Sequence, residues 1–240
     1  MIMHSSEMRL RLTQLGYDDK LSKEEIIEKV KRIYLEETGK KLKADIKVYT
    51  SKEARVGEKS GYNGIAIYID SKENKKDELY VISQGSKDIK DWDYNIKAML
   101  AGKDIRQAKA TNKFVKATQG HFNLNKNEDS TSIIGLSHSL AHNNNTTAYL
   151  LYDTFDEIYS VNGAQTNYYQ LYNANLEFRE TVQSKFSISP IDPNAVYDID
   201  PNKLRQFAEA YYKDKAKNIH QVINLFAVKV TFSDSRSSHA

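Results

Sequence analysis

The residue best suited to act as a chemical group in a reaction is Ser139, within the segment SIIGLSHSLAHNNNTTAY at residues 132–149. The β-branched start of this segment predicts a strand, and the residues after Ser139 predict a helix. A serine on a sharp turn between a strand and a helix is the layout of a nucleophile elbow. The elbow needs small residues two positions before and after the serine, and Ser137 and Ala141 are both small. A serine hydroxyl also needs a base, usually a histidine that a carboxylate orients.

A second segment, YVISQGSKDIKDWDYN at residues 80–95, precedes the serine in the chain. A predicted strand ends there at Gln84-Gly85-Ser86, and a helix is predicted from Asp91. A glycine and a small hydroxyl residue at a strand end can offer a backbone N–H and a side-chain donor to an oxyanion. Together the two segments supply a candidate nucleophile and candidate oxyanion donors.

These two segments resemble the class 3 (fungal-type) lipase family of α/β hydrolases. That family has a strand ending F-R-G-T/S, then D-W-x-x-N, and later G-H-S-L-G-G. The corresponding residues here are S-Q-G-S, D-W-D-Y-N and S-H-S-L-A-H, in the same order. The resemblance covers about residues 60–225, and the chain also looks like the lipase-type domains of secreted toxins of low-GC Gram-positive bacteria.

The resemblance implies that Ser139 is the nucleophile of a serine ester hydrolase acting on acyl lipids, of the lipase or phospholipase A type. Ser86 and the backbone N–H of Leu140 would form the oxyanion hole. The implied reaction passes through an acyl-enzyme and needs no cofactor and no metal. Two departures bear on activity: Gln84 replaces the family's arginine, and Ala141-His142 replaces Gly-Gly. A non-catalytic pseudo-hydrolase that binds lipid or protein is therefore the alternative.

The acid and the base of the triad are also implied by the family's order, Ser…Asp…His. Residues 186–189 predict the strand that precedes the acid, which makes Asp192 the candidate acid. Asp198 and Asp200 are close enough in the sequence to compete with it. The base must follow the acid, and His220, between a charged helix and an apolar run, is preferred over His239 in the polar tail.

The elements around these residues predict an α/β fold with a mostly parallel central sheet, and the resemblance implies a single α/β-hydrolase domain spanning 1–240 with helices on both faces. The period of the apolar residues predicts an N-terminal helical segment at 1–44, in which Ser22 and Glu25 have capping-box spacing. Alternating runs predict strands that form an antiparallel edge of the sheet. The remaining expectations are strands at 157–161 and 186–189, helices at 91–100, 105–118, 166–183 and 202–217, and a disordered tail at 233–240.

Composition narrows the choice of partners. The 35 basic and 32 acidic residues give a net charge of +3, which does not favour nucleic acid. There is no cysteine, which excludes thiolate metal sites. His138 and His142 lack the intervening glutamate of a zinc-protease helix, so zinc-dependent hydrolysis is not expected. No apolar run approaches a membrane span, and the N-terminus lacks a secretory h-region. We therefore expect a cytoplasmic protein, or one secreted without a cleaved signal peptide.

Three further expectations concern partners and packing. The basic stretch from Lys97 to Lys116 could be a lid that makes peripheral membrane contact, or simply the solvated face of an amphipathic helix. A protein partner is expected if the chain is an exported effector. Three consecutive asparagines, Asn143 to Asn145, are unusual at a helix start, and the sequence gives them no chemical role.

Overall fold

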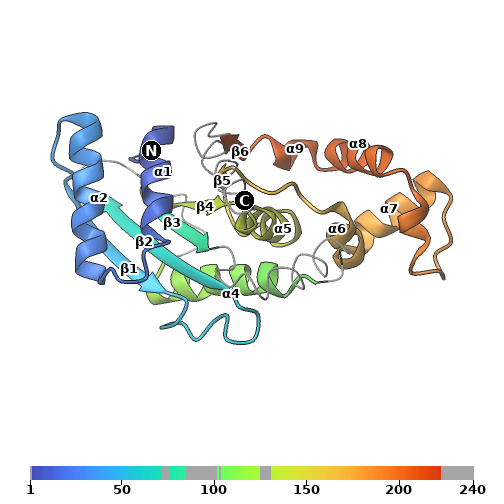
Figure 1. The fold of residues 1–240 in the computed structure, drawn as a ribbon, viewed down its shortest axis with the longest axis horizontal. Coiled ribbons are helices and arrows are strands. Elements are labelled where there is room, and N and C mark those ends of the chain that lie inside the picture. Colours follow the sequence, from blue (N-terminus) through green and yellow to red (C-terminus); the bar gives the residue numbers. More distant parts are fainter. Residues whose placement is uncertain (1, 72–75, 85–101, 103, 125–130, 223–240) are drawn as a thin grey trace, which may run out of the picture.

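The computed structural model describes residues 2–71, 76–84, 102, 104–124 and 131–222 (Figure 1). Its centre is one six-stranded sheet whose spatial order follows the chain, from β1 to β6. The strands are β1 (Ala44–Thr50), β2 (Asn63–Ser71), β3 (Asp77–Gln84), β4 (Thr131–His138), β5 (Glu157–Val161) and β6 (Ile219–Val222). The first three pair antiparallel, and β3 to β6 run parallel. The predicted α/β class and its antiparallel edge are confirmed.

Two N-terminal helices, α1 (Ser6–Leu15) and α2 (Lys23–Thr38), cover one face of the sheet. Leu12 and Val30 are fully buried there, in one apolar cluster with sheet residues such as Leu136. The predicted capping box of α2 is present, with Ser22 and Glu25 each bonded to the other's backbone N–H. These helices are amphipathic, so burial of their apolar stripes holds them on the sheet.

The opposite face carries α4 (Arg106–His121) and α5 (Ala141–Tyr152). Phe114 of α4 is fully buried in an apolar cluster with Val81 and Ile158 of the sheet. Residues 106–116 of the predicted lid are therefore part of a core helix, and most of the remainder lies outside the described residues. Further helices extend from this layer toward one end of the molecule (Figure 1): α6 (Tyr168–Ala174), α7 (Leu176–Phe186), a short 3-10 helix at Ala195–Asp198, α8 (Pro201–Tyr211) and α9 (Lys213–Ala216).

The predicted strand at 186–189 is wrong. Phe186 is the last residue of α7, and Ser187 ends that helix in the left-handed conformation, with φ 53°. Phe186 and Ile188 pack against the helical side of the core instead of entering the sheet. The strand beside β5 is β6, which comes later in the chain.

Other boundaries differ from expectation for local reasons. The single helix expected at 166–183 is divided at Asn175, whose side chain accepts a hydrogen bond from the Phe178 N–H and so begins a new helix. The helix expected at 91–100 and the tail at 233–240 lie outside the described residues. Among the helices that the structure describes, none combines the length and the apolar character needed to cross a membrane.

Candidate active site

Ser139 occupies the junction between β4 and α5 and has a φ of 53°. Left-handed backbone at a residue with a side chain costs about 1–2 kcal/mol, so the surroundings must hold it. Its N–H donates to the Val161 carbonyl at 3.3 Å, and its carbonyl accepts from the N–H groups of His142 at 3.1 Å and Ala164 at 2.9 Å. The serine is thus fixed in a strained turn by the next strand's end and by the first turn of its own helix.

The space around this turn comes from small residues on both sides. Ser137 and Ala141 are completely buried, as the elbow geometry requires. Gly163, in the turn after β5, has a different role: a Cβ there would lie 2.7 Å from two ring carbons of His142. The bulk that His142 adds where the lipase family has glycine is therefore accommodated by a glycine on the neighbouring turn.

The site lies at the carboxyl edge of the parallel strands. Ser83 of β3 is level with Ser137 of β4, so the carboxyl end of β3 lies beside the elbow. Gln84 is buried at this edge, where its Oε1 accepts from Asn63 Nδ2 at 2.7 Å and its Nε2 donates to Asp19 Oδ1 at 3.5 Å. Its role is structural, because it ties the start of β2 to the turn after α1.

The two candidate oxyanion donors are Ser86 and the backbone N–H of Leu140. Ser86 lies outside the described residues. Leu140 precedes the first residue of α5, and its N–H donates to no acceptor in the described part of the chain. Free N–H groups at a strand-to-helix turn are suited to receive a developing negative charge. Ser139 Oγ likewise has no hydrogen-bond partner among the described residues.

A cavity of about 300 Å³ adjoins the elbow on the α1 side. It is lined by Leu10, Tyr17, His138, Val161 and Asn162, among others. The His138 ring meets the Tyr17 ring edge to face, with centroids 6.0 Å apart. Burial lowers the pKa of His138, so this wall of the cavity is uncharged at neutral pH. The cavity is thus a mainly apolar chamber next to the serine.

His220, the candidate base, lies in β6 opposite Tyr159. Its ring is stacked on the Tyr159 ring at 4.5 Å, and its Nε2 is 4.0 Å from a carboxylate oxygen of Glu157. Glu157 is the first residue of β5 and so lies at the amino ends of the parallel strands, whereas Ser139 lies at their carboxyl ends. The structure therefore does not bring His220 to the serine.

The candidate acid is also distant from the candidate base. Asp192 is exposed in the segment between α7 and α8, and its Oδ1 accepts from the Asn194 N–H at 2.8 Å. That segment lies at the end of the molecule remote from β6 (Figure 1). The competitor Asp200 caps α8, and Asp198 is exposed beside it. The assignment of Asp192 depended on a strand at 186–189, which is helix end and loop.

The three asparagines of α5 have a role that the sequence did not indicate. Asn143 is fully buried; its Nδ2 donates to Gln170 Oε1 at 2.7 Å and its Oδ1 accepts from the Asn167 N–H at 2.9 Å. Gln170 Nε2 in turn donates to the Asp104 carbonyl at 2.6 Å. This polar core joins α5 to the segments that precede α4 and α6.

The two other asparagines extend this network. Asn144 Nδ2 donates to Gln107 Oε1 at 2.5 Å, and Asn145 Nδ2 donates to the Leu136 carbonyl at 3.3 Å. Among the described residues, Asn145 Oδ1 and the hydroxyls of Ser137 and Ser160 are buried without a hydrogen-bond partner. Unpaired buried polar groups reduce stability, and they concentrate here beneath the elbow.

Burial of His142 makes the free energy of unfolding of the protein depend on pH. Burial lowers its pKa to about 4, whereas an unfolded histidine has a pKa near 6.5. The unfolded state therefore binds more protons below pH 6.5, so stability falls as the pH drops toward 4, by up to about 3 kcal/mol. Urea unfolding at pH 7.5 and pH 4.5 measures this loss. The variant His142→Gln should lose distinctly less stability between the two pH values, and an equal loss would contradict the assignment.

The fold and this site define an α/β protein with a strained serine at a strand-to-helix turn. The family described as Domain of unknown function (DUF6792) matches residues 7–230, and the chain belongs to that family. "Putative uncharacterized protein YvcB" of Bacillus subtilis (strain 168) is 33% identical over 247 residues. The match covers 93% of this chain but only 38% of that relative's length. No solved structure matches the chain.

Proposed function

We propose that the chain is an α/β-hydrolase-type serine esterase in which Ser139 is the nucleophile. The observation that carries the proposal is the φ of 53° at Ser139, between a parallel strand and a helix. Ser187 has the same φ at the end of α7, so the strain counts only together with the position: at a strand-to-helix turn it presents the serine hydroxyl at the end of the sheet. The local resemblance to the class 3 lipase motifs points to the same chemistry.

The proposed reaction starts when Ser139 Oγ attacks the carbonyl carbon of an ester and gives up its proton to a histidine. The N–H of Leu140 and, by resemblance, Ser86 donate to the oxyanion that forms. The histidine then protonates the leaving alcohol as the acyl-enzyme forms. In the second half of the reaction the histidine takes a proton from a water molecule, which attacks the acyl-enzyme. The free acid is released as Ser139 Oγ leaves and regains its proton from the histidine.

The base in this proposal is one of two histidines that follow β5. The contacts of His220 with Tyr159 and Glu157 weigh against it; His239 lies outside the described residues. Comparing the ester hydrolysis rates of His220→Ala and His239→Ala tests both, because loss of the base slows the reaction by orders of magnitude. The role of Asp192 as the acid that orients the histidine rests only on the order of the triad residues in the lipase family.

The substrate class proposed is an acyl lipid or a related ester. The 300 Å³ cavity beside His138 supports it, since apolar residues such as Leu10 and Val161 can surround an acyl chain. The basic face of α4 is consistent with peripheral contact with an anionic membrane.

Covalent labelling tests the function directly. A fluorophosphonate should modify the wild-type protein at Ser139, as mapped by peptide mass spectrometry, and should leave Ser139→Ala unmodified. The variant Ser137→Ala is the matched control, because that serine is buried two residues away and should not affect labelling. Absence of labelling in a folded protein would favour the alternative, a non-catalytic lipid- or protein-binding module. The positions of His220, which is not brought to Ser139, and of Asp192, which is remote from β6, favour this alternative.

A further inference from the structure

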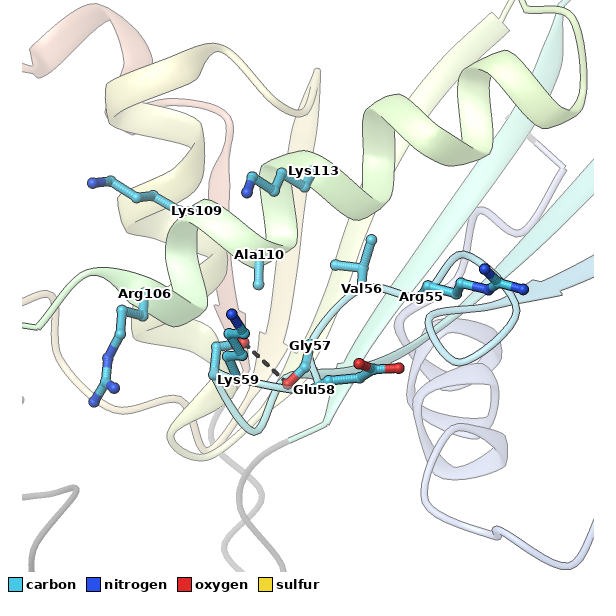
Figure 2. A pocket seen from close by; sticks show the side chains of 10 residues that line it. Arg55, Val56, Gly57, Glu58, Lys59, Arg106, Lys109, Ala110 and Lys113 are labelled. Carbon is cyan, nitrogen blue, oxygen red and sulfur yellow. Dashed lines mark hydrogen bonds between the residues drawn. The ribbon is translucent and has the colours of Figure 1, made fainter.

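A second pocket, of about 350 Å³, lies between the β1–β2 connection and α4. The connection contributes residues 55–60, and the first two turns of α4 contribute Arg106, Lys109, Ala110 and Lys113. Figure 2 shows the connection passing below the helix, with Val56 directed up toward it and Ala110 directed down from it. The pocket therefore combines apolar surface, to which Val56 and Ala110 contribute, with charged groups around it.

The walls of this pocket are strongly positive. Five of the lining side chains are cationic and one, Glu58, is acidic: the cations are Arg55, Lys59, Arg106, Lys109 and Lys113. In Figure 2, Lys59 points from the connection toward α4, whereas Arg55 and Glu58 extend to the other side. Lys59, Arg106, Lys109 and Lys113 lie on the same side of the pocket, away from Arg55 and Glu58.

Most of this charge is not neutralised by neighbours. Arg106 pairs with Asp104 at 2.7 Å, and that guanidinium lowers the pKa of Asp104. Within the described residues, Lys59, Lys109 and Lys113 have no carboxylate within 4 Å. Like charges gathered without counter-ions repel one another, so an anion bound between them would be stabilised.

The connection that carries Lys59 is held in one shape. The N–H of Gly61 donates to the Gly57 carbonyl at 2.9 Å, and Ser60 Oγ donates to the same carbonyl at 3.4 Å. Gly57 has a φ of 106°, and a Cβ there would lie 2.1 Å from the Tyr62 carbonyl oxygen. A preformed wall loses little conformational freedom when a ligand binds.

The pocket is linked to the elbow through the same polar core. Gln107, between Arg106 and Lys109 in the chain, accepts the hydrogen bond from Asn144 of α5. The connection ends at Asn63, which is level with Gln84 at the carboxyl end of β3. Both sites therefore border one edge of the sheet.

We propose that this pocket binds a phosphate group through Lys59, Lys109 and Lys113, with Arg106 at its rim. Phosphate matches the pocket because it carries up to two negative charges and several acceptor oxygens. The source is either the head group of a phospholipid or free phosphate. The first source rests on the proposed function and makes a phospholipid the ester that Ser139 attacks.

The test uses Ser139→Ala protein, so that binding is measured without turnover. Calorimetry compares three probes: monomeric dihexanoylphosphatidylglycerol, dihexanoylglycerol, which lacks phosphate, and inorganic phosphate. The double variant Lys109→Gln/Lys113→Gln should weaken binding of the phospholipid tenfold or more and leave binding of dihexanoylglycerol unchanged. The control Lys41→Gln/Lys116→Gln removes equal charge from exposed lysines outside the pocket and should change affinity less than twofold.

The outcomes separate the two proposals. Inorganic phosphate that binds as tightly as the phospholipid, with the same tenfold loss in the double variant, supports the pocket with free phosphate as its ligand. Equal affinity in the double variant and the control overturns the phosphate site. Ester hydrolysis by the wild type with no phosphate binding overturns the site alone, whereas phosphate binding without fluorophosphonate labelling overturns the esterase alone.

Discussion

Replacing Ser139 by glycine is expected to remove activity and raise stability at once. Turnover of a short-chain ester should fall at least about 10³-fold, because the proposed nucleophile is lost. The free energy of unfolding should rise by about 1 kcal/mol, because glycine adopts the φ of 53° without a Cβ penalty. Ester hydrolysis and urea unfolding at pH 7.5 measure the two effects.

Two controls make this result specific to the site. Ser139→Ala keeps the Cβ, so it should lose the same activity without gaining stability. Ser187 ends α7 with an identical φ of 53° and is exposed. Ser187→Gly should therefore gain a similar stability and keep full activity. If Ser139→Gly retains activity, Ser139 is not the nucleophile. If its free energy of unfolding is unchanged, the backbone at Ser139 is not strained.

Replacing Asn143 by alanine is expected to have the largest effect on stability. The change removes hydrogen bonds to Gln170 Oε1 and from the Asn167 N–H, both beside a fully buried side chain. A buried polar group left without a partner costs about 1–3 kcal/mol, so the total should be about 2–4 kcal/mol. Urea unfolding at pH 7.5 measures it.

The same variant should also slow ester hydrolysis, because the Asn143 network positions the segments before α4 and α6. Asn202, in the first turn of α8 and exposed, is the matched control, and Asn202→Ala should change stability by less than about 0.5 kcal/mol. A loss below about 1 kcal/mol in Asn143→Ala would show that the network is not a source of stability.

Several features that lower the stability of the protein lie together at the elbow. Ser139 is strained, and Asn145 Oδ1 and two serine hydroxyls beneath it lack partners in the described part of the chain. Each feature lowers stability, and apolar side chains or glycine would relieve it. Proteins accept such costs where function needs them, and the apolar clusters on both faces of the sheet offset them.

The amino-acid sequence by itself determined the elements whose signals are local. The capping box at Ser22, the alternating strands of the antiparallel edge and the strand–serine–helix order around Ser139 were all predicted and are present. Each depends on side-chain periodicity or on hydrogen bonds within a few residues, which a sequence displays directly.

Only the tertiary structure decided which segments meet. The run at 186–189 has strand-like residues, yet β6 takes the place beside β5, because strand pairing depends on neighbours distant in the chain. The same holds for Gly163 beneath His142, for the buried partners of Asn143 and for the basic pocket between two separate elements. Residue types named Ser139 as the candidate nucleophile, but its backbone strain arises from contacts with the ends of β5 and α5, which no local pattern specifies.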